Sequence, residues 1–453
     1  MSGNDVQRLV NLYPQRLEPK GDVEFIYTSV PGLKQLAYIG GVVRGAIKTN
    51  DRAFFVFGTN LCEVMADGYF LVRGQLISST GPVSMAYGSF QLVMVDGPAG
   101  YVLRLSTNVF AQITDPDFYG SVAVRFMALK FLFVRPGSGQ FYWSEIDDAS
   151  NLDALDFATA ESQPDSLVTL EVDHSEAYLF GQYTTEIWFA VDTAAQFQRS
   201  QGSGMEVGCM AAQSVRQIDN SIFWIGRDKA GGGIVYRAQG HQPVRVSTHE
   251  QEEDIQAMAD PSSIRAWAYQ DKGLTFYGFS TDTTTWVYEV STGRWPERCD
   301  RDAAGLLKPS RGQVVLFAYD KHFMGADDGW LYTLDAGTYT NGTDALIREL
   351  TTPRQVDAEG REIVFTEFWA RLKTGGAAQG ADPQVELSWT DDAGKSWATP
   401  VLRALGKVGE IIQRVLWAPV GGFTRDRAWR IRFSGNAPFQ IRSFKAKGRP
   451  GRH

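Results

Sequence analysis

EAYLFG and TEIWFAVD, at residues 176–181 and 185–192, are two short apolar segments separated by a turn. Each has the length of a β-strand, and each is rich in the aromatic and β-branched residues that favour strands. The same pair of segments returns about every 40 residues, a period typical of stacked supersecondary units. The repeat therefore predicts a β-propeller.

About seven such units lie between residues 41 and 340. The first segment of each unit is apolar over nearly its whole length, which is needed where neighbouring sheets cover both faces of a sheet, as between propeller blades. These segments are Arg52–Gly58, Ser89–Asp96, Phe126–Val134, Glu176–Gly181, Ser221–Gly226, Leu274–Phe279 and Val314–Tyr319. The stretch from Asp147 to Pro164 fits no strand and is interpreted as an insertion.

The repeat ends after Thr340, which divides the chain into three parts. Residues 1–40 hold two strand candidates, at 23–27 and 34–39, and are predicted to close the propeller ring, which occupies residues 41–353. Residues 354–453 contain strands with alternating apolar and polar side chains, the pattern of a sheet with one face in water. The predicted fold class is all-β: a β-propeller of about seven blades with a C-terminal β-sandwich-like domain.

Charge is divided unevenly between these parts. Residues 1–353 contain 27 basic and 42 acidic residues, a net charge of −15, whereas residues 354–453 contain 17 basic and 10 acidic residues, a net charge of +7. Nucleic-acid binding requires clustered Lys and Arg, so the acidic propeller is not expected to grip DNA. The basic tail at 442–452 leaves two interpretations open, a solvated end and a docking peptide for an acidic partner.

Residues of the types that bind metals or act in catalysis lie far apart in the sequence. Cys62, Cys209 and Cys299 lie far apart without a Cys-x-x-Cys spacing, which predicts buried reduced thiols rather than disulfides or a zinc site. The five histidines show no metal-ligand spacing, and no nucleophile elbow, phosphate-binding loop or zinc-protease motif occurs. We therefore expect no enzyme activity and no cofactor. The sequence also predicts neither a membrane span nor a signal peptide.

One motif, Asp392–Trp397 (DAGKSW), has the pattern of the Asp box known from sialidase propellers. It occurs once and lies in the second domain, so we interpret it as a hairpin turn.

Acidic runs at 145–148 and 252–254 leave an alternative open, a glycan-binding or glycan-cleaving propeller acting in receptor recognition. Such a protein would bring two carboxylates together with tryptophans in one exposed cleft. Tryptophans packed inside the blades would count against it. The tryptophans considered are Trp143, Trp188, Trp224, Trp267, Trp286 and Trp330.

Several segments resemble the packaged-DNA-stabilising tail hub, or nozzle, proteins of short-tailed bacteriophages. The resemblance begins with Asn11–Pro14 (NLYP), continues with Pro31–Leu33 and Val43–Gly45, and extends over the run from Phe141 to Trp188. Within this run the matching pieces are Tyr142–Ser144, Leu155–Glu161, Pro164–Asp165 and Leu179–Trp188. In the second domain the resemblance rests on the Asp-box hairpin and on the Arg-rich closing strands.

The resemblance implies a structural virion protein made in the host cytoplasm and placed in the phage tail. It implies a hexamer, a sixfold ring below the portal–adaptor complex that retains packaged DNA and forms the channel for its ejection. Expected partners are further copies of the chain, the adaptor and portal, and tail fibre, spike or needle proteins, with transient contact to translocating DNA. The residues predicted to contact partners are Arg430, Arg432, Lys445, Lys447 and Arg449.

Overall fold

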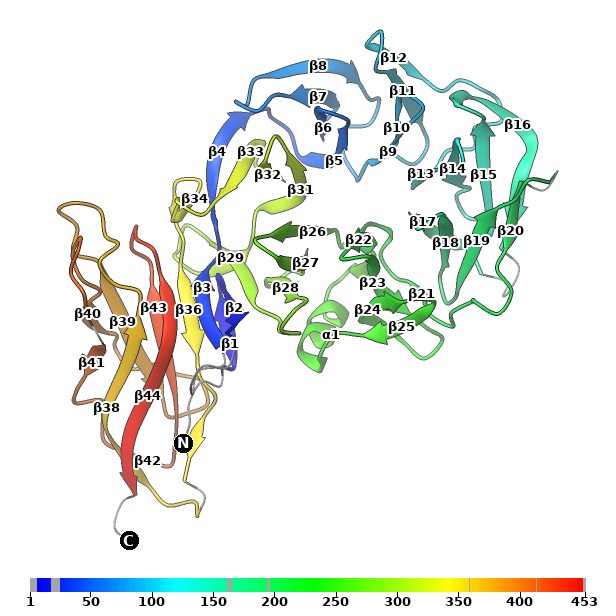
Figure 1. Ribbon diagram of the computed structural model, residues 1–453. Helices are drawn as coiled ribbons and strands as arrows, with labels where there is room; N and C mark the ends of the chain where they lie inside the picture. Colours follow the sequence, from blue (N-terminus) through cyan, green and yellow to red (C-terminus); the bar gives the residue numbers. More distant parts are fainter. Residues whose placement is uncertain are drawn as a thin grey trace. The chain divides into compact units, whose positions relative to one another are not determined.

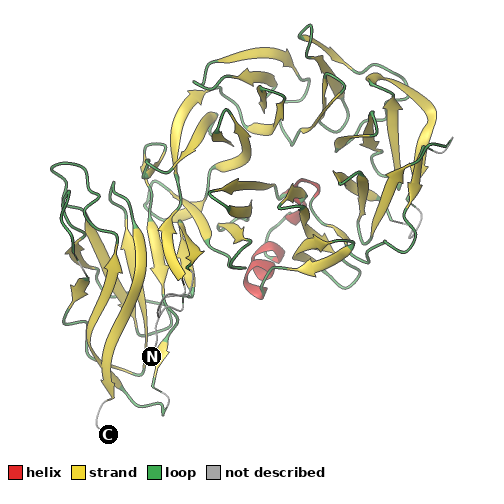
Figure 2. Ribbon diagram, in the orientation of Figure 1, coloured by secondary structure: helices red, strands yellow, loops and turns green. Residues whose placement is uncertain are grey.

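The structure is a computed structural model that describes residues 6–17, 25–160, 165–193, 196–357, 359–412 and 414–450. These residues form mostly β-strands, together with one α-helix, α1 (His249–Gln256), and two short 3-10 turns (Figures 1 and 2). The chain divides into two compact units. The propeller unit contains Gln35–Thr283 and Arg311–Thr333, and the sandwich unit contains Met1–Lys34, Thr284–Ser310 and Leu334–His453.

The propeller unit consists of consecutive antiparallel sheets, the fold class predicted from the repeat. The first three sheets are β5 (Val43–Thr49), β6 (Arg52–Phe57), β7 (Asn60–Val64) and β8 (Phe70–Gln75); β9 (Ser84–Gly88), β10 (Gln91–Val95), β11 (Gly100–Arg104) and β12 (Val109–Gln112); and β13 (Val124–Met127), β14 (Lys130–Val134), β15 (Gln140–Glu145) and β16 (Asp148–Thr159). The next two are β17 (Leu167–Asp173), β18 (Glu176–Gly181), β19 (Thr185–Ala190) and β20 (Phe197–Arg199); and β21 (Gly208–Cys209), β22 (Arg216–Ile218), β23 (Ser221–Arg227), β24 (Gly232–Gln239) and β25 (Gln242–Arg245).

Two further sheets complete the propeller unit. The sixth contributes β26 (Ala266–Asp271) and β27 (Leu274–Ser280), and the seventh contains β31 (Gly312–Ala318), β32 (Lys321–Ala326), β33 (Trp330–Asp335) and β4 (Gly32–Tyr38). The innermost strands, β5, β9, β13, β17, β22, β26 and β31, neighbour one another in a closed ring. In Figure 1 they surround a common centre. The predicted propeller of about seven blades is therefore confirmed.

Packing between the blades explains why the repeated segments are apolar on both faces. In β6 the adjacent residues Phe54 and Phe55 are both fully buried, but they belong to different clusters, because successive strand side chains point to opposite faces. Phe54 packs in the cluster that contains Leu92 of the second blade, and Phe55 packs in the cluster that contains Phe323 of the seventh. Each blade therefore buries both of its faces.

The predicted insertion at 147–164 is wrong over most of its length. Residues 148–159 form β16, the outer strand of the third blade, which pairs with β15. The pairing register shifts between Tyr142 and Glu145, so the strand carries extra residues relative to its partner. Much of β16 is exposed, and this combination of bulge and exposure removes the apolar pattern by which a strand is recognised. Residues 161–164 lie outside the described part of the chain.

The sandwich unit contains two sheets, as predicted for the C-terminal part. One has the order β28 (Thr285–Glu289), β29 (Glu297–Arg301), β1 (Arg8–Val10), β36 (Arg348–Thr351), β43 (Asp426–Phe433), β39 (Gln384–Thr390) and β40 (Val401–Ala404), with β30 (Leu307–Pro309) and β37 (Gln355–Val356) beside it. The other has the order β2 (Leu12–Arg16), β3 (Phe25–Ser29), β44 (Gln440–Pro450), β38 (Ile363–Leu372) and β41 (Val415–Trp417), with β42 (Phe423–Thr424) beside it. The short strands β34 (Thr340–Asn341) and β35 (Asp344–Ala345) pair with each other.

Strands near the N-terminus are part of this sandwich. β1 pairs with β36, and β3 pairs with β44, so the core between the sheets contains Leu9 and Tyr27 together with Trp429. The predicted strand at 23–27 corresponds to β3 over residues 25–27, whereas residues 23 and 24 lie outside the described part. The division of the chain at residues 40 and 353 remains a prediction.

Candidate functional site: a basic face on the sandwich

The last described strand, β44, carries a row of basic side chains on one face. It pairs with β38 so that Lys445 lies opposite Trp369 and Lys447 lies opposite Glu367. Because strand side chains alternate between faces, Phe444 enters the core while Lys445 and Lys447 are exposed, as is the next alternate residue, Arg449. Residues 442–450 therefore belong to a strand with an exposed basic side, and both interpretations of the basic tail, a solvated end and a docking peptide for an acidic partner, stay open.

Trp369 lies on the same outward face, and the side chains of two arginines lie near its rings. The guanidinium groups of Arg371 and Arg414 lie 5.9 Å and 6.0 Å from the centre of its rings. Both separations are within the range of cation–π attraction. Nearby, the Lys447 ammonium lies 3.5 Å from the Glu367 carboxylate. We call this surface, made by Trp369, Arg371, Arg414, Lys445, Lys447 and Arg449, the basic face.

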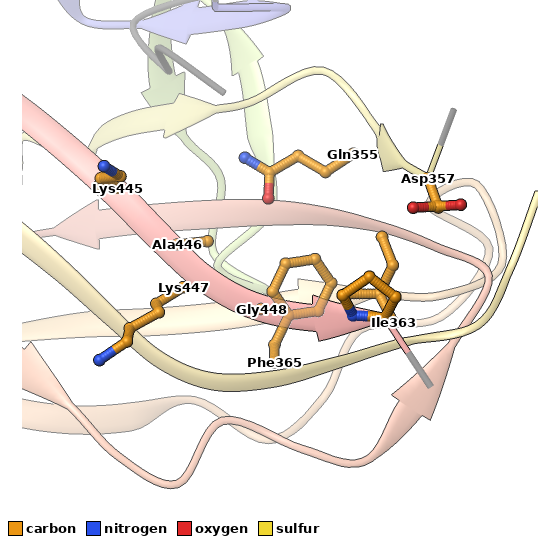
Figure 3. A pocket seen from close by; sticks show the side chains of 9 residues that line it. Gln355, Asp357, Ile363, Phe365, Lys445, Ala446, Lys447 and Gly448 are labelled. Atoms are coloured by element: carbon orange, nitrogen blue, oxygen red, sulfur yellow. The ribbon is translucent and has the colours of Figure 1, made fainter. Parts of the chain in front are cut away.

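A cavity of about 300 Å³ adjoins one end of the basic face. Its apolar lining includes Ile363 and Phe365, and its polar lining includes Asp357 together with Lys445 and Lys447. Figure 3 shows the Lys447 side chain extending away from Phe365. The Asp357 carboxylate forms an ion pair with the Arg361 guanidinium, whose Nε lies 2.9 Å from it. This contact is the main reason that the pKa of Asp357 falls to about 2.

The other two predicted contact residues, Arg430 and Arg432, lie on β43 in the other sheet. Arg432 donates from Nε to the Glu349 carboxylate at 2.8 Å. Arg430 lies over the Trp397 ring, 3.9 Å from its centre, and burial lowers its pKa. Both arginines therefore have partners within the sandwich. The five residues do not form one surface, and their contacts with other proteins remain a prediction.

The Asp-box segment forms the predicted hairpin turn between β39 and β40. The Asp392 carboxylate accepts hydrogen bonds from the backbone N–H of Ser396 at 2.9 Å and from its hydroxyl at 2.6 Å, and a third from the Thr390 hydroxyl at 2.7 Å. These bonds, first of all that from the Ser396 side chain, lower the pKa of Asp392 from 3.8 to about 2. The motif is therefore a structural turn of the sandwich.

This shift predicts a defined pH dependence for the hairpin. Because the folded-state pKa lies below the ordinary value, ionised Asp392 stabilises the fold above about pH 4, and this contribution is lost as the pH falls through 2. We expect Asp392→Asn to lower the thermal midpoint at pH 6, with the difference from wild type disappearing near pH 2. Asp382→Asn, at an exposed acid of the same unit, serves as the control. Equal shifts for the two variants at pH 6 would contradict this role of Asp392.

The features considered for a glycan site do not come together. Trp143, Trp188, Trp224, Trp267 and Trp286 are all buried, most of them inside the clusters between blades, and Trp330 is half-buried. In the second acidic run, the Glu252 carboxylate is bound by Arg245 at 2.6 Å. Buried tryptophans of this kind count against the glycan alternative.

The cysteine prediction is confirmed, because all three thiols are free and buried. Burial raises the pKa of each to about 12. Among the described residues no group of three or more His, Cys, Asp or Glu side chains is placed to hold a metal ion. No helix in the described ranges is long and apolar enough to cross a membrane.

The sequence interpretation missed a set of arginines at the centre of the propeller. Arg44, Arg125, Arg216 and Arg265 line one cavity among the innermost strands. Each follows a β-branched apolar residue near the start of an inner strand, as Val43-Arg44, Val124-Arg125, Val215-Arg216 and Ile264-Arg265. The same dipeptide also occurs at Val72-Arg73, Val134-Arg135 and Val244-Arg245, which do not line the cavity, so it does not identify the central arginines by itself.

The fold and the basic face define a class of protein: a propeller joined to a sandwich, with an outward charged surface. Two family models match the chain in succession. One is described as Bacteriophage P22 Gp10, beta-propeller, and covers residues 6–339; the other is described as Bacteriophage P22 Gp10, beta-sandwich, and covers residues 348–449. The chain belongs to this family, that of a DNA-stabilising structural protein of the phage tail, which confirms the resemblance noted in the sequence.

Comparison with solved structures gives distant matches. A computationally designed protein, Ika8, is 15% identical with a TM-score of 0.39, and the match covers 73% of this chain and 99% of that one. The Cps50 (Swd1) propeller domain of Myceliophteria thermophila is 8% identical with a TM-score of 0.42, covering 66% and 98%. YCF48 bound to D1 peptide is 14% identical with a TM-score of 0.42, covering 68% and 98%. No curated protein matches the sequence.

Proposed function

We propose that this chain is the hub, or nozzle, of a phage tail. In this proposal the chain is made in the host cytoplasm, and six copies form a ring below the portal–adaptor complex that retains packaged DNA and forms the channel for its ejection. The observation that carries the proposal is the match of both family models, one after the other, over nearly the whole chain. The buried tryptophans do not favour the glycan-binding alternative.

The basic face supplies a surface for an acidic neighbour in the tail. Lys445 and Arg449 are exposed and make no ion pair within the described residues, and Lys447 has only the 3.5 Å contact with Glu367. Trp369 adds a large aromatic side chain, a residue type enriched at protein interfaces. We propose that the adaptor–portal complex, or a fibre, spike or needle protein, contacts this face. Arg430 and Arg432 have internal partners and would mainly hold β43 in place.

The propeller unit would meet DNA in a different way. Apart from the central arginines, its part of the chain carries an excess of acidic residues, and such an excess repels the phosphate backbone rather than neutralising it. Translocating DNA would therefore touch the channel only transiently. A channel of this kind lets DNA pass without holding it.

The mass of the purified chain in solution tests the assembly. We would measure it by light scattering, alone and after mixing with an assembled portal–adaptor complex from the same phage. An increase in the mass of the complex equal to six chains supports the proposed hub. A chain that stays unbound with that complex at every concentration used would contradict it.

Charge reversal tests the basic face within this assembly. We expect Lys445→Glu/Lys447→Glu to weaken association with the portal–adaptor complex by about tenfold or more, because attraction across the interface becomes repulsion. Wild-type association should weaken with added salt, and the variant should lose much of this dependence. The affinity at a series of salt concentrations is the measurement.

A matched control keeps the number of reversed charges constant. Lys395→Glu/Lys407→Glu changes two exposed lysines of the sandwich unit that are not part of the basic face. We expect this variant to bind like the wild type. If both double variants lost binding equally, the effect would come from net charge and the basic face would not be the contact surface.

A further inference from the structure

A cavity of about 220 Å³ lies among the innermost strands of the propeller unit. The residues that line it include four arginines and two glutamines, and among the described residues no Asp or Glu belongs to the lining. These polar residues are Arg44, Arg125, Arg216, Arg265, Gln213 and Gln313. A chain with a net charge of −8 thus places a concentration of positive charge at the centre of its propeller.

Two of the arginines are held by the blades. Arg44 is buried and donates to the carbonyl oxygens of Gly81 and Ser78, both at 2.7 Å. Arg125 forms a two-pronged ion pair with the Glu171 carboxylate, at 2.5 Å and 2.7 Å. Most N–H donors of Arg44 and Arg125 therefore have acceptors, so these two side chains line the cavity in fixed positions.

Arg216 and Arg265 are held much more weakly. Arg216 donates one hydrogen bond, to the carbonyl of Val215 at 2.7 Å, and Arg265 donates one, to the carbonyl of Val43 at 2.9 Å. In the part of the chain that the structure describes, neither makes an ion pair. The charge of Arg265 acts on Asp327, whose pKa burial raises. Among the described residues, most guanidinium donors of Arg216 and Arg265 therefore have no acceptor.

The electrostatics of Arg216 agree with this geometry. Burial, with a further contribution from the charge of Arg125, lowers the pKa of Arg216 to about 10, although the charge of Glu171 acts in the opposite direction. Burial therefore disfavours the charged form of Arg216, and a bound anion would favour it. Neutral donors are close by, because the side-chain amides of Gln213 and Gln313 make no hydrogen bond to other described residues. The buried indole N–H of Trp267, which also lines the cavity, has no partner among them either.

We propose that this cavity binds a small oxyanion of the phosphate class, with Arg216 and Arg265 as its charged contacts and Gln213 and Gln313 as neutral donors. The planar guanidinium fork matches two oxygens of a phosphate group. The volume is below the roughly 300–1,000 Å³ typical of sites for drug-sized ligands, so a phosphate group with bound water fits better than an organic molecule. The group could belong to free phosphate or to a nucleic-acid backbone.

Titration of the full chain with inorganic phosphate tests the site. We expect saturable binding of one phosphate per chain by calorimetry and a rise in the thermal midpoint, because a ligand that binds only the folded state stabilises it. Sodium chloride at matched ionic strength should produce a smaller rise. Arg216→Gln should weaken phosphate binding by about tenfold or more, the loss expected when a charge-assisted hydrogen bond is removed.

Arg104→Gln is the matched control, because Arg104 is exposed, lies 3.8 Å from Asp148 and does not line the cavity. This variant should bind phosphate like the wild type. The proposal is overturned if the wild type binds no phosphate, if chloride matches its effect, or if Arg216→Gln binds as tightly as Arg104→Gln. If Arg216→Gln does not fold, the wild-type titration decides alone. If a short single-stranded oligonucleotide competes with phosphate, the natural ligand is a nucleic-acid backbone. If the oligonucleotide does not compete, the natural ligand is free phosphate.

Discussion

Replacing Asn11 by Ala is expected to lower the free energy of unfolding by about 3–6 kcal/mol, because one buried side chain joins three backbone groups. Its Nδ2 donates to the carbonyls of Cys299, at 2.8 Å, and Ile347, at 2.7 Å, and its Oδ1 accepts from the N–H of Cys299 at 3.0 Å. Alanine would leave all three groups buried without a partner. The measurement is the urea dependence of the far-ultraviolet circular dichroism.

The backbone of Asn11 adds a second, separable effect. Its φ of 52° lies in the left-handed region, where Ala is strained but Gly is not. Asn11→Gly should therefore lose the same hydrogen bonds and yet be more stable than Asn11→Ala by about 1 kcal/mol. Equal stability of the two variants would show that strain at this position is negligible. Wild-type stability of either variant would contradict the role of the side chain.

Replacing Trp429 by Ala is expected to cost about 3–5 kcal/mol, the range measured for deleting a large aromatic side chain from a core. Trp429 is fully buried between the two sheets of the sandwich. Its ring centre lies 4.9 Å from that of Phe368 and 5.2 Å from that of Phe365. Because domains are stable by only about 5–15 kcal/mol, this loss should shift the thermal midpoint strongly.

Trp369→Ala provides the matched control for Trp429→Ala. Trp369 lies in the same unit but on the outward face, where it is half-buried and contacts Arg371 and Arg414. Losing those contacts should cost about 1–2 kcal/mol. We expect Trp369→Ala to keep most of the stability while weakening partner binding. Similar losses of stability in the two variants would contradict the assignment of Trp429 to the core and Trp369 to the surface.

The sequence predicted those features that depend on local pattern. The propeller followed from repeated segments such as Phe54–Phe57, which are apolar on both faces because each blade packs between two others. The hairpin at Asp392 followed from a short motif whose side chain bonds its own turn. The strand β16 was missed because its register shift and exposure remove the alternation of apolar residues.

Other features depend on contacts between residues far apart in the chain. No local pattern indicates that β1 lies between β29 and β36, because such pairing depends on the whole sheet. The charges of Lys445 and Lys447 led to the prediction that they contact partners, which stays a prediction. Their alignment with Trp369 could not be predicted, because it depends on the register of β38 and β44. The central arginines were missed because they are isolated in sequence and meet only when the ring closes.

The position of β1 and β3 also determines when the protein can finish folding during its synthesis. β1 can pair with β29 and β36 only after residues 297–301 and 348–351 have been made. β3 can pair with β44 only after residues 440–450 have been made. At about 5–20 residues per second, the ribosome needs roughly 20–90 s to make the residues from β1 to the end of β44. Until then these early strands expose unpaired edges and apolar side chains. A chain that terminates before β44 therefore lacks a strand of the sandwich, so residues 440–450 must be made before both sheets of this unit can be complete.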